Sequence, residues 1–423
     1  MMEKKELLNL AKKTKEASRE LSILTNDQKN NILDKISINL KKYSSNILEN
    51  NIIDIENAKK NKKDYSFIDR LTLSDKKIEN MAHAIQEIIN LKNPVGEILE
   101  ERTLSGEMNL KKISVPLGVI GVIYESRPEI TTDIGCLGIK SGNAVILKGG
   151  KESINTNIIL EKIIKDSSKE VGCNPNIVNV IKSTDRKITE EFLLLDEYID
   201  LMIPRGGESL VNMVGEKAKM PSISGGVGVS HIYVDEHADF EKAIKITFNA
   251  KVSKPSVCNA LDTLLINTKI LPNLIQKLTE PLIESNVELR CDNKTYELLN
   301  VKNEKVKLAN EDDWGNEFLD YKMSIRCVDD INDAIKHIQR YGSGHTDAII
   351  SESDESINKF IENVDSAVVM INASTQFNDG GEFGMGAEVA VSTNKYGARG
   401  PMGLKDLCSY KWILKGNGNI RIR

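Results

Sequence analysis

Short, fully apolar runs that alternate with helical patterns constrain this chain more than any other feature of its sequence. Residues 119–123 and 144–147 contain no polar side chain, which is typical of strands buried on both faces of a parallel sheet. Helical patterns follow over 128–141 and 152–171, and the alternation continues beyond residue 207. Strand–helix repeats of this length predict a doubly wound α/β domain.

A second alternation begins at His231 and predicts a second α/β domain. Its expected strands lie at 231–234, 263–266, 287–291, 323–328, 346–350 and 367–371, and its expected helices at 238–250, 270–285, 330–341 and 353–364. Residues 373–404 are glycine-rich and irregular, as loops that cross between domains would be.

The remaining segments predict a helical N-terminus and a projecting arm. Apolar residues recur at three- and four-residue spacing over 4–91, which favours helices. Residues 97–104 and 108–115 read as two strands around Ser105-Gly106, a hairpin signal, and the tail 409–422 as a last strand. An arm of this kind suggests a homo-oligomer, a homodimer or a dimer of dimers.

Composition excludes several classes of protein. The 423 residues are 40% hydrophobic and 28% charged with a net charge of -5, so two or three globular domains are expected and no basic block predicts nucleic-acid binding. No apolar run is long enough for a membrane span, and the N-terminus lacks the apolar core of a signal peptide. The six cysteines are scattered and the five histidines have no ligand spacing, which predicts a cytoplasmic protein without disulfides or a metal site.

One cysteine lies where a nucleophile would be useful. Cys258 falls in the turn 254–259, between an expected helix and the apolar run 263–266. A thiol at a turn can be reached by substrate and can have backbone amides beside it to bind an oxyanion. Lys251 and Lys254 are near in sequence and could favour the thiolate. The alternative is a small buried hydrophobic side chain.

Two glycine-containing turns follow expected parallel strands, where ligands bind in open α/β sheets. Lys148-Gly149-Gly150-Lys151 comes after the strand 144–147, and Arg205-Gly206-Gly207 after the strand 201–203. Lysines and bare helix amides there could contact the ribose or phosphate of a nucleotide. Neither standard nucleotide-binding fingerprint is present, so plain strand–helix turns remain the alternative.

Three further turns carry polar side chains that could bind a substrate. Glu125-Ser126-Arg127-Pro128 follows the strand 119–123, and Arg127 could grip an anionic group with two parallel hydrogen bonds. Asn372-Ala373-Ser374-Thr375 and Ala398-Arg399-Gly400-Pro401 offer more hydrogen-bonding groups. A surface salt bridge and loop capping are the alternatives.

Taken in order, these landmarks resemble the aldehyde dehydrogenase superfamily, and within it the γ-glutamyl phosphate reductase (glutamate-5-semialdehyde dehydrogenase) family. The resemblance runs nearly from end to end. Its specific stretches are 115–128, 142–152, 203–207, the Cys258 turn, 372–375, 384–393 and 398–404.

The resemblance implies NADPH-dependent reduction of L-glutamyl 5-phosphate to L-glutamate 5-semialdehyde, with phosphate released, in proline biosynthesis. Cys258 matches the family nucleophile, whose thiolate forms a thioester, and the oxyanion would be held by its backbone amide and by another donor such as Asn259. The implied substrate-binding residues are Ser126, Arg127, Asn372, Ser374, Thr375 and Arg399. Whether a glutamate 5-kinase channels the acyl phosphate to this protein stays open.

The resemblance also implies a site for the cofactor. Lys148 matches the residue that contacts the adenosine ribose, and Glu317 aligns with the glutamate that holds the nicotinamide ribose. Lys151 stands where NAD-preferring members have an acidic residue, and a cation there suits the 2′-phosphate of NADPH. Gly149, Gly150, Gly206, Gly207, Gly225 and Gly226 complete the expected cofactor-binding set.

The fold implied is aldehyde-dehydrogenase-like, with two doubly wound α/β domains and a small oligomerisation arm. The expected boundaries are 1–96 and 117–228 for the NADPH-binding domain, joined by about 378–404, then 229–377 for the cysteine domain. The arm would be 97–116 and 405–423.

Two departures from the wider superfamily bear on the chemistry. Hydrolytic members carry a general-base glutamate where this chain has Ile223-Ser224-Gly225-Gly226, and Ser126 stands where oxidative members have an oxyanion-binding asparagine. An enzyme that reduces its thioester gains by lacking a base that activates water. A CoA-acylating aldehyde dehydrogenase and a non-catalytic nucleotide-binding scaffold remain alternative readings.

Overall fold

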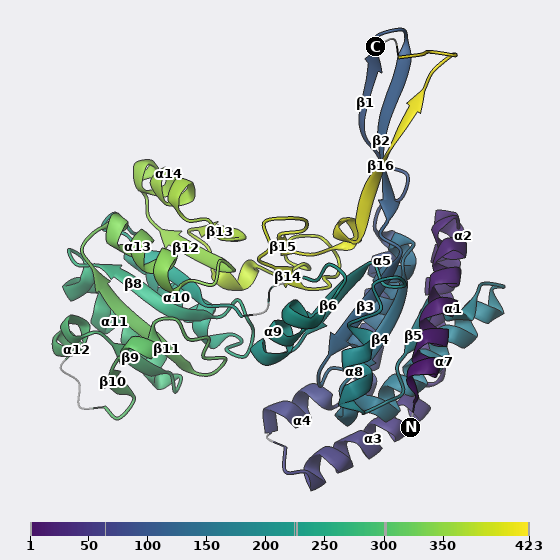
Figure 1. The fold of residues 1–423 in the computed structure, drawn as a ribbon. Helices are drawn as coiled ribbons and strands as arrows, with labels where there is room; N and C mark the ends of the chain where they lie inside the picture. Colours follow the sequence, from purple (N-terminus) through teal and green to yellow (C-terminus); the bar gives the residue numbers. More distant parts are fainter. Residues whose placement is uncertain (1, 64, 224, 226, 300–302, 422–423) are drawn as a thin grey trace. The chain divides into compact units, whose positions relative to one another are not determined.

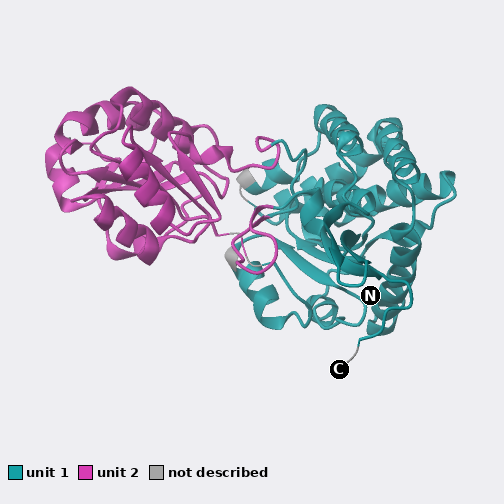
Figure 2. Cartoon of the chain, turned by 90° about the horizontal axis from the view of Figure 1, so that it is seen from above, with its two compact units in different colours: residues 1–224, 384–390, 402–423 teal, residues 225–383, 391–401 magenta. Residues whose placement is uncertain are grey.

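The chain divides into two compact units in the computed structural model, which describes residues 2–63, 65–223, 225, 227–299 and 303–421. Unit 1 comprises 1–224, 384–390 and 402–423, and unit 2 comprises 225–383 and 391–401 (Figure 2). The division after residue 224 lies four residues before the expected boundary, and the stretch expected to join the cofactor domain is shared between the units. Which unit binds cofactor and which carries catalysis remains a prediction.

Unit 1 is built on a parallel sheet of four strands in the order β5-β4-β3-β6. Every residue of β3 (Val119–Tyr124) and β4 (Ala144–Gly149) is buried, which is why their sequences contain so few polar side chains. The other strands are β5 (Val178–Val180) and β6 (Leu201–Arg205), and the intervening helices are α6 (Ile130–Ser141), η1 (Lys151–Ser153), α7 (Ile154–Glu170), η2 (Pro175–Ile177), α8 (Arg186–Phe192) and α9 (Glu208–Lys217).

The helical N-terminus is confirmed, and its described residues form five helices. Thr25 begins α2 with a reciprocal capping box and Ser74 caps α5 through its side chain, so local sequence decides where these helices start. Leu7 and Ala11 join the apolar core against the sheet of unit 1. The helices are α1 (Lys4–Ser22), α2 (Asn26–Lys42), α3 (Ser44–Lys60), α4 (Tyr65–Leu71) and α5 (Asp75–Asn90).

Three antiparallel strands form an arm that projects from the rest of unit 1 (Figure 1). β1 (Ile98–Leu104) pairs with β2 (Met108–Pro116), so the predicted hairpin is confirmed. β16 (Cys408–Lys415) lies on the other side of β2 and pairs with it along its whole length, although the sequences are almost 300 residues apart. The part that the arm plays in oligomerisation remains a prediction.

Unit 2 contains a seven-stranded sheet in the order β10-β9-β11-β8-β7-β12-β13, in which every pair of neighbours is parallel. All its strands therefore begin at one edge and end at the other. The strands are β7 (Ser230–Val234), β8 (Leu261–Asn267), β9 (Glu288–Cys291), β10 (Val306–Leu308), β11 (Lys322–Val328), β12 (Thr346–Ile350) and β13 (Val368–Ile371). The helices are α10 (Phe240–Val252), α11 (Leu271–Glu284), α12 (Asn293–Leu299), η3 (Glu311–Asp313), α13 (Ile331–Tyr341) and α14 (Asp354–Asn363).

The glycine-rich segment 373–404 is less irregular than its sequence suggests. It contains the short turns η4 (Thr375–Phe377) and η5 (Leu404–Leu407). β14 (Val391–Ser392) and β15 (Gly400–Pro401) form a two-residue antiparallel ladder. Such a short ladder gives no alternating pattern that sequence reading can detect.

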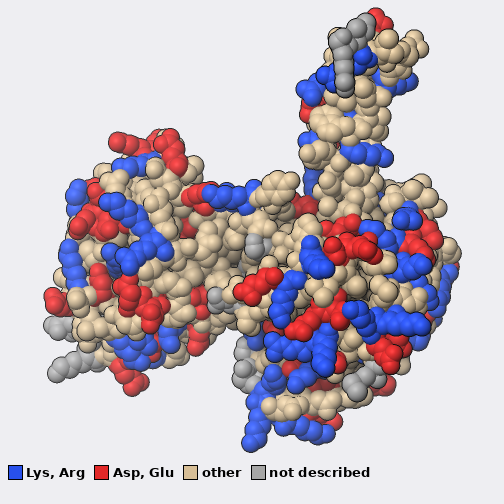
Figure 3. Space-filling view, viewed as in Figure 1, with Lys and Arg blue, Asp and Glu red and all other residues tan. Residues whose placement is uncertain are grey.

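The surface has no region of one charge on the face seen in Figure 3, where lysines and arginines are interspersed with aspartates and glutamates over each unit. In the described part of the chain, no helix has both the length and the apolar character needed to cross a bilayer.

Candidate active site

The turn that carries Cys258 is held at the edge of unit 2 where the parallel strands begin. It connects the end of α10 to the start of β8. The side-chain amide of Gln376 donates to the carbonyls of Ala250 (3.1 Å) and Lys254 (3.2 Å), which fastens the end of α10 and the start of the turn. Cys258 is half-exposed.

Comparison with two other cysteines separates Cys258 from a core residue. Cys136 and Cys291 are buried, and burial raises the pKa of both thiols, that of Cys291 to about 12. Such thiols stay protonated and inert at neutral pH. The half-exposed Cys258 is not buried as these two are, and its role as the nucleophile stays a prediction.

Gly228 brings Cys258 and Glu317 together. A Cβ atom at Gly228 would lie 1.8 Å from the carbonyl oxygen of Cys258, so only glycine permits this approach. The Gly228 amide donates to Oε1 of Glu317 at 2.9 Å. The expected nucleophile and the expected ribose-binding carboxylate therefore both contact one glycine.

Asn259 is committed to the protein rather than presented to a substrate. Its Nδ2 donates to the carbonyls of Gln376 (3.3 Å) and Asn378 (3.0 Å), and the side chain is buried. These bonds tie the turn to the segment around η4. A side-chain role in an oxyanion hole would require Nδ2 to give up one of these partners, which the sequence alone could not reveal.

In unit 1, three turns predicted to bind ligands lie together at the edge where the strands end. The amide of Gly207, the first residue before α9, donates to Oε2 of Glu125 at 3.3 Å. A Cβ atom at Gly150 would be 3.9 Å from the backbone nitrogen of Ser126. Because the helix N-terminal amide of Gly207 already faces the Glu125 carboxylate, a phosphate at that position would have to displace Glu125.

Two lysines flank the turn after β4 and differ in environment. Lys148 is buried, its Nζ donates to the carbonyl of Gly149 at 3.1 Å, and burial lowers its pKa. Lys151 is exposed. Gly149 is required by packing, because a Cβ atom there would lie 2.1 Å from Nδ2 of Asn157. One buried and one exposed cation beside a tight turn fit the ribose and phosphate of a nucleotide.

Ser126 has a strained backbone at the same edge of unit 1. Its φ of 53° lies in the left-handed region, which is uncommon for any residue except glycine. Its side chain is buried and its neighbour Arg127 is half-buried. Strain of this kind is typical of residues that the surrounding structure holds for a function.

The other expected substrate residues are divided over unit 2. Both amide atoms of Asn372 hydrogen-bond to the backbone of Ser351, at the edge opposite the Cys258 turn. Ser374 caps η4, and Thr375 belongs to it, next to the Gln376 that holds the turn. Nη2 of Arg399 donates to the carbonyl (2.7 Å) and to Oδ1 (2.8 Å) of Asp365. Gly225 is half-buried beside Val391, and Gly226 lies outside the described residues.

Comparisons with known proteins agree on one family. The model of the aldehyde dehydrogenase family matches residues 1–296. A γ-glutamyl phosphate reductase of Clostridium botulinum (strain Eklund 17B / Type B) is 44% identical over 417 residues, which cover 99% of this chain and 100% of the relative. The crystal structure of a γ-glutamyl phosphate reductase from Thermotoga maritima is 40% identical with a TM-score of 0.95 and covers 98% of this chain and 100% of that chain.

The chain belongs to the γ-glutamyl phosphate reductase family. The resemblance drawn from the sequence is confirmed, and so is the aldehyde-dehydrogenase-like α/β fold. An acetylating aldehyde dehydrogenase from Geobacillus thermoglucosidasius shares only the fold, with 16% identity and a TM-score of 0.71 over 99% of this chain and 98% of that chain. As a member of the γ-glutamyl phosphate reductase family, the protein is an oxidoreductase, and enzymes of the wider family use a nicotinamide cofactor.

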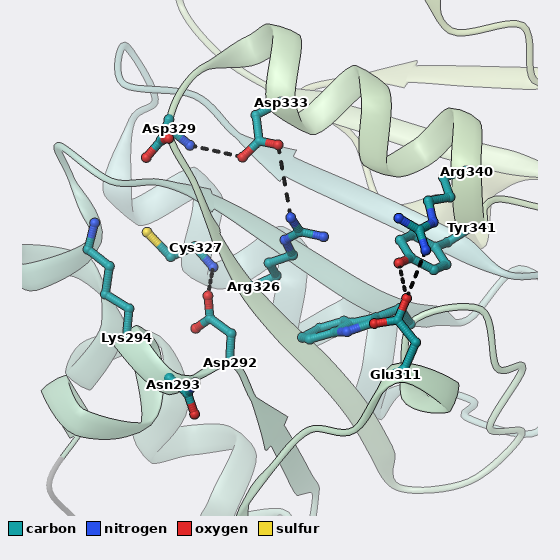
Figure 4. Close-up of a pocket in the computed structure, with 11 residues that line it drawn as sticks. Asp292, Asn293, Lys294, Glu311, Arg326, Cys327, Asp329, Asp333, Arg340 and Tyr341 are labelled. Carbon is teal, nitrogen blue, oxygen red and sulfur yellow. Dashed lines mark hydrogen bonds and ion pairs between the residues drawn. The ribbon is translucent and has the colours of Figure 1, made fainter.

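A pocket of about 930 Å³ in unit 2 lies apart from the Cys258 turn of this γ-glutamyl phosphate reductase family member (Figure 4). Asp292 and Asp329 line it where β9 and β11 end, whereas Cys258 precedes the start of β8. Two of its charged side chains have partners within the pocket: Asp292 accepts from the backbone amide of Cys327 at 3.0 Å, and Arg340 donates to Glu311 at 3.1 Å. Asp292 and Asp329 therefore lie at the edge of the sheet opposite the Cys258 turn.

Sequence reasoning missed two residues that shape this family site. Gly228 follows Gly225 and Gly226, which are predicted to bind the cofactor, and the sequence does not reveal that Gly228 lies against the carbonyl of Cys258. Asp262 is a buried carboxylate inside the apolar strand β8. A charged residue in such a run is itself a signal, because buried aspartates are rare unless they are paired.

Proposed function

We propose that this protein reduces L-glutamyl 5-phosphate to L-glutamate 5-semialdehyde with NADPH and releases phosphate. That reaction is the second step from glutamate to proline. One observation supports it most: Cys258 and Glu317 meet at Gly228, in a chain that is 44% identical to a γ-glutamyl phosphate reductase over nearly its full length.

Cys258 is the proposed nucleophile. Its thiolate Sγ attacks the carbonyl carbon of the acyl phosphate, a C–S bond forms, and the C–O bond to phosphate breaks with the electron pair leaving on phosphate. Collapse after reduction breaks the C–S bond, returns the thiolate and frees the aldehyde. Residues 223–226 contain no carboxylate to activate water, which protects the thioester from hydrolysis.

The cofactor is proposed to lie against the turns of unit 1. Bound NADPH supplies the hydride that reduces the thioester. Lys148 would hold the adenosine ribose and Lys151 the 2′-phosphate, while Glu317 would hold the nicotinamide ribose. The buried Lys148 ammonium, which donates to the carbonyl of Gly149, and the exposed Lys151 fit these roles.

Substrate would be held by side chains with donor groups that no other described residue uses. Among the described residues, Arg399 uses Nη2 on Asp365, which leaves its Nε and Nη1 groups for a carboxylate or phosphate. Arg127, Ser126, Ser374 and Thr375 are the other candidates. We also propose a cytoplasmic homodimer or dimer of dimers formed through the arm, supplied with its labile substrate by a glutamate 5-kinase.

The reverse reaction tests the proposal. Wild-type protein should reduce NADP⁺ in the presence of glutamate semialdehyde and phosphate, measured by absorbance of NADPH. Cys258→Ala should lose this activity by at least about 10³-fold while NADPH binding, followed by fluorescence, is unchanged. Activity with CoA in place of phosphate would indicate a CoA-acylating enzyme, and full turnover by the variant would refute the mechanism.

A further inference from the structure

A buried carboxylate lies at the start of β8, just after the Cys258 turn. Asp262 is the second residue of β8, four positions after Cys258, and is only 2% exposed. The residues around it in β8 are fully buried, so this charge is placed in an otherwise dry layer. A buried carboxylate without partners is strongly destabilising, so the contacts of Asp262 are necessary for the folded structure.

The two oxygens of Asp262 bind two different segments. Oδ1 accepts the backbone N–H of Phe318 at 3.0 Å, and Oδ2 accepts that of Ser230 at 3.3 Å. Phe318 follows Glu317 directly, and Ser230 opens β7 two residues after Gly228. One carboxylate therefore spans the loop of Glu317 and the approach to β7.

The approach to β7 contacts the nucleophile turn directly, and the loop of Glu317 is joined to that turn through Gly228. Ser230 Oγ donates to the carbonyl of Cys258 at 3.5 Å, and Gly228 lies against that same carbonyl while it donates to Glu317. The loop of Glu317 also contains a strained residue, Leu319, with a φ of 51°. A non-glycine residue in this region persists only where neighbouring contacts hold it, and the bond from Phe318 to Asp262 is such a contact.

Lys251 supplies an opposite charge to this layer. Its side chain is fully buried, and its Nζ makes no hydrogen bond within the described part of the chain. Burial lowers its pKa to about 8, against the opposing fields of Asp262 and Asp320. Burial raises the pKa of Asp262 to about 6, against the fields of Lys251 and His231 and the two amide bonds. The field of each group therefore favours the charged form of the other.

We propose that Asp262 is a positioning residue, which fixes the Glu317 loop and the Gly228 segment against the Cys258 turn, with Lys251 as its counter-charge. Asp262 would touch neither substrate nor cofactor, and the inference rests on the proposed function only for its assay. Misplacement of reacting groups by about 1 Å can cost about 10²-fold in rate. Asp262 would thus control the placement of Glu317 relative to Cys258 without belonging to the site itself.

A double-mutant cycle tests this role. Asp262→Asn keeps the shape of the side chain but turns an NH₂ group toward one of the two N–H donors. Asp262→Asn and Glu317→Gln should each lower kcat/KM for NADPH by about 10- to 100-fold, and the double variant should fall no more than threefold below the worse single variant. If the two residues acted independently, the fold-losses in kcat/KM of the two single variants would multiply in the double variant, because the free-energy effects of uncoupled residues add.

Asp235→Asn is the matched control. Asp235 is equally buried at 2% and accepts from Tyr233 Oη (3.0 Å) and Ser351 Oγ (2.7 Å), but it follows the end of β7, at the opposite edge of the sheet. The kcat/KM of this variant for NADPH should stay within threefold of wild type. In a double variant, its fold-loss should multiply with that of Glu317→Gln.

Three outcomes would overturn the inference. The first is a kcat/KM of Asp262→Asn within threefold of wild type. The second is a double variant whose loss in kcat/KM equals the product of the two single losses. The third is an Asp235→Asn variant that loses as much kcat/KM as Asp262→Asn. If Asp262→Asn does not fold by circular dichroism, Asp262→Ser enters the same cycle. If wild type has no turnover, the proposed function fails, and the cycle is read instead from NADPH dissociation constants by fluorescence.

Discussion

Close approach at single residues decides the shape of the candidate site. A Cβ atom at Gly228 would lie 1.8 Å from the carbonyl oxygen of Cys258, far inside any real contact. The backbone cannot yield cheaply there, because the same glycine holds Glu317 through its amide. The site therefore depends on the absence of one side chain as much as on the thiol.

Replacing that glycine should remove activity without unfolding the protein. We expect Gly228→Ala to lower kcat by at least about 100-fold, because the added methyl pushes the Cys258 turn away from the Glu317 loop. Steady-state kinetics and thermal unfolding measure the two effects. Gly215→Ala, in the exposed face of α9 with nothing within 4 Å of the added atom, is the control and should keep full activity. A Gly228→Ala variant with wild-type kcat would show that the approach is unimportant.

A single charge should decide between the two nicotinamide cofactors. Lys151 is exposed beside the turn after β4, where the 2′-phosphate of NADPH is proposed to lie. Lys151→Glu should raise KM for NADPH by about 10-fold or more, roughly 1.4 kcal/mol, and leave KM for NADH little changed. Lys13→Glu, an exposed lysine on α1, controls for the change in net charge. Equal loss with both cofactors would place Lys151 away from the phosphate.

At the scale of elements, the edge strands of unit 2 depend on a charged cluster. Glu288 on β9 pairs with Lys307 on β10 (2.6 Å) and with Arg290 (2.7 Å). Burial opposes the charge, but these partners hold the pKa of Glu288 at about 2, below its ordinary 4.5. A depressed carboxyl pKa stabilises the folded state above about pH 4.5, and that contribution is lost as pH falls toward 2.

Glu288→Gln should therefore lower stability in a pH-dependent way. The expected loss is about 1 kcal/mol or less, because the cluster is partly exposed and screened by solvent. In urea unfolding, the difference in free energy of unfolding between wild type and variant should be constant at pH 6–8 and should become smaller as pH falls below about 4.5. Glu280→Gln, an exposed residue of α11, should show no such dependence. A gap that widens in acid would contradict the assignment.

Elements were predictable where one physical force dominates their sequence. β3 and β4 are buried on both faces, so their apolar runs predict them as strands. Thr25 and Ser74 predict helix starts because their side chains cap the first turn. β10 and α12 were missed because a three-residue strand with two exposed side chains and a seven-residue helix carry almost no periodic signal. The site followed the same rule: Cys258 is visible from its turn, while the roles of Asn259 and Asp262 depend on partners distant in sequence.

At the scale of the whole molecule, the arm lacks a core of its own. Every residue of β16 after Cys408 is exposed, and so are most of β1's. A three-stranded sheet needs an apolar face packed against something to be stable, and an edge strand with unpaired amides invites another strand. Trp412, Ile413 and Leu414 are all exposed on that edge strand, so a second copy of the chain is the proposed cover.

Charge on the edge strand should separate the copies. Wild type should have at least twice the 47.1 kDa mass of one chain by light scattering after size-exclusion chromatography, and Ile413→Lys should shift it toward the monomer. Burying a lysine ammonium in an apolar contact costs several kcal/mol, which is enough to dissociate a dimer at micromolar concentration. Ile52→Lys, at an exposed isoleucine of α3, is the matched control and should leave the mass unchanged. A monomeric wild type, or an Ile413→Lys variant of unchanged mass, would mean that the arm is covered in another way or serves another purpose.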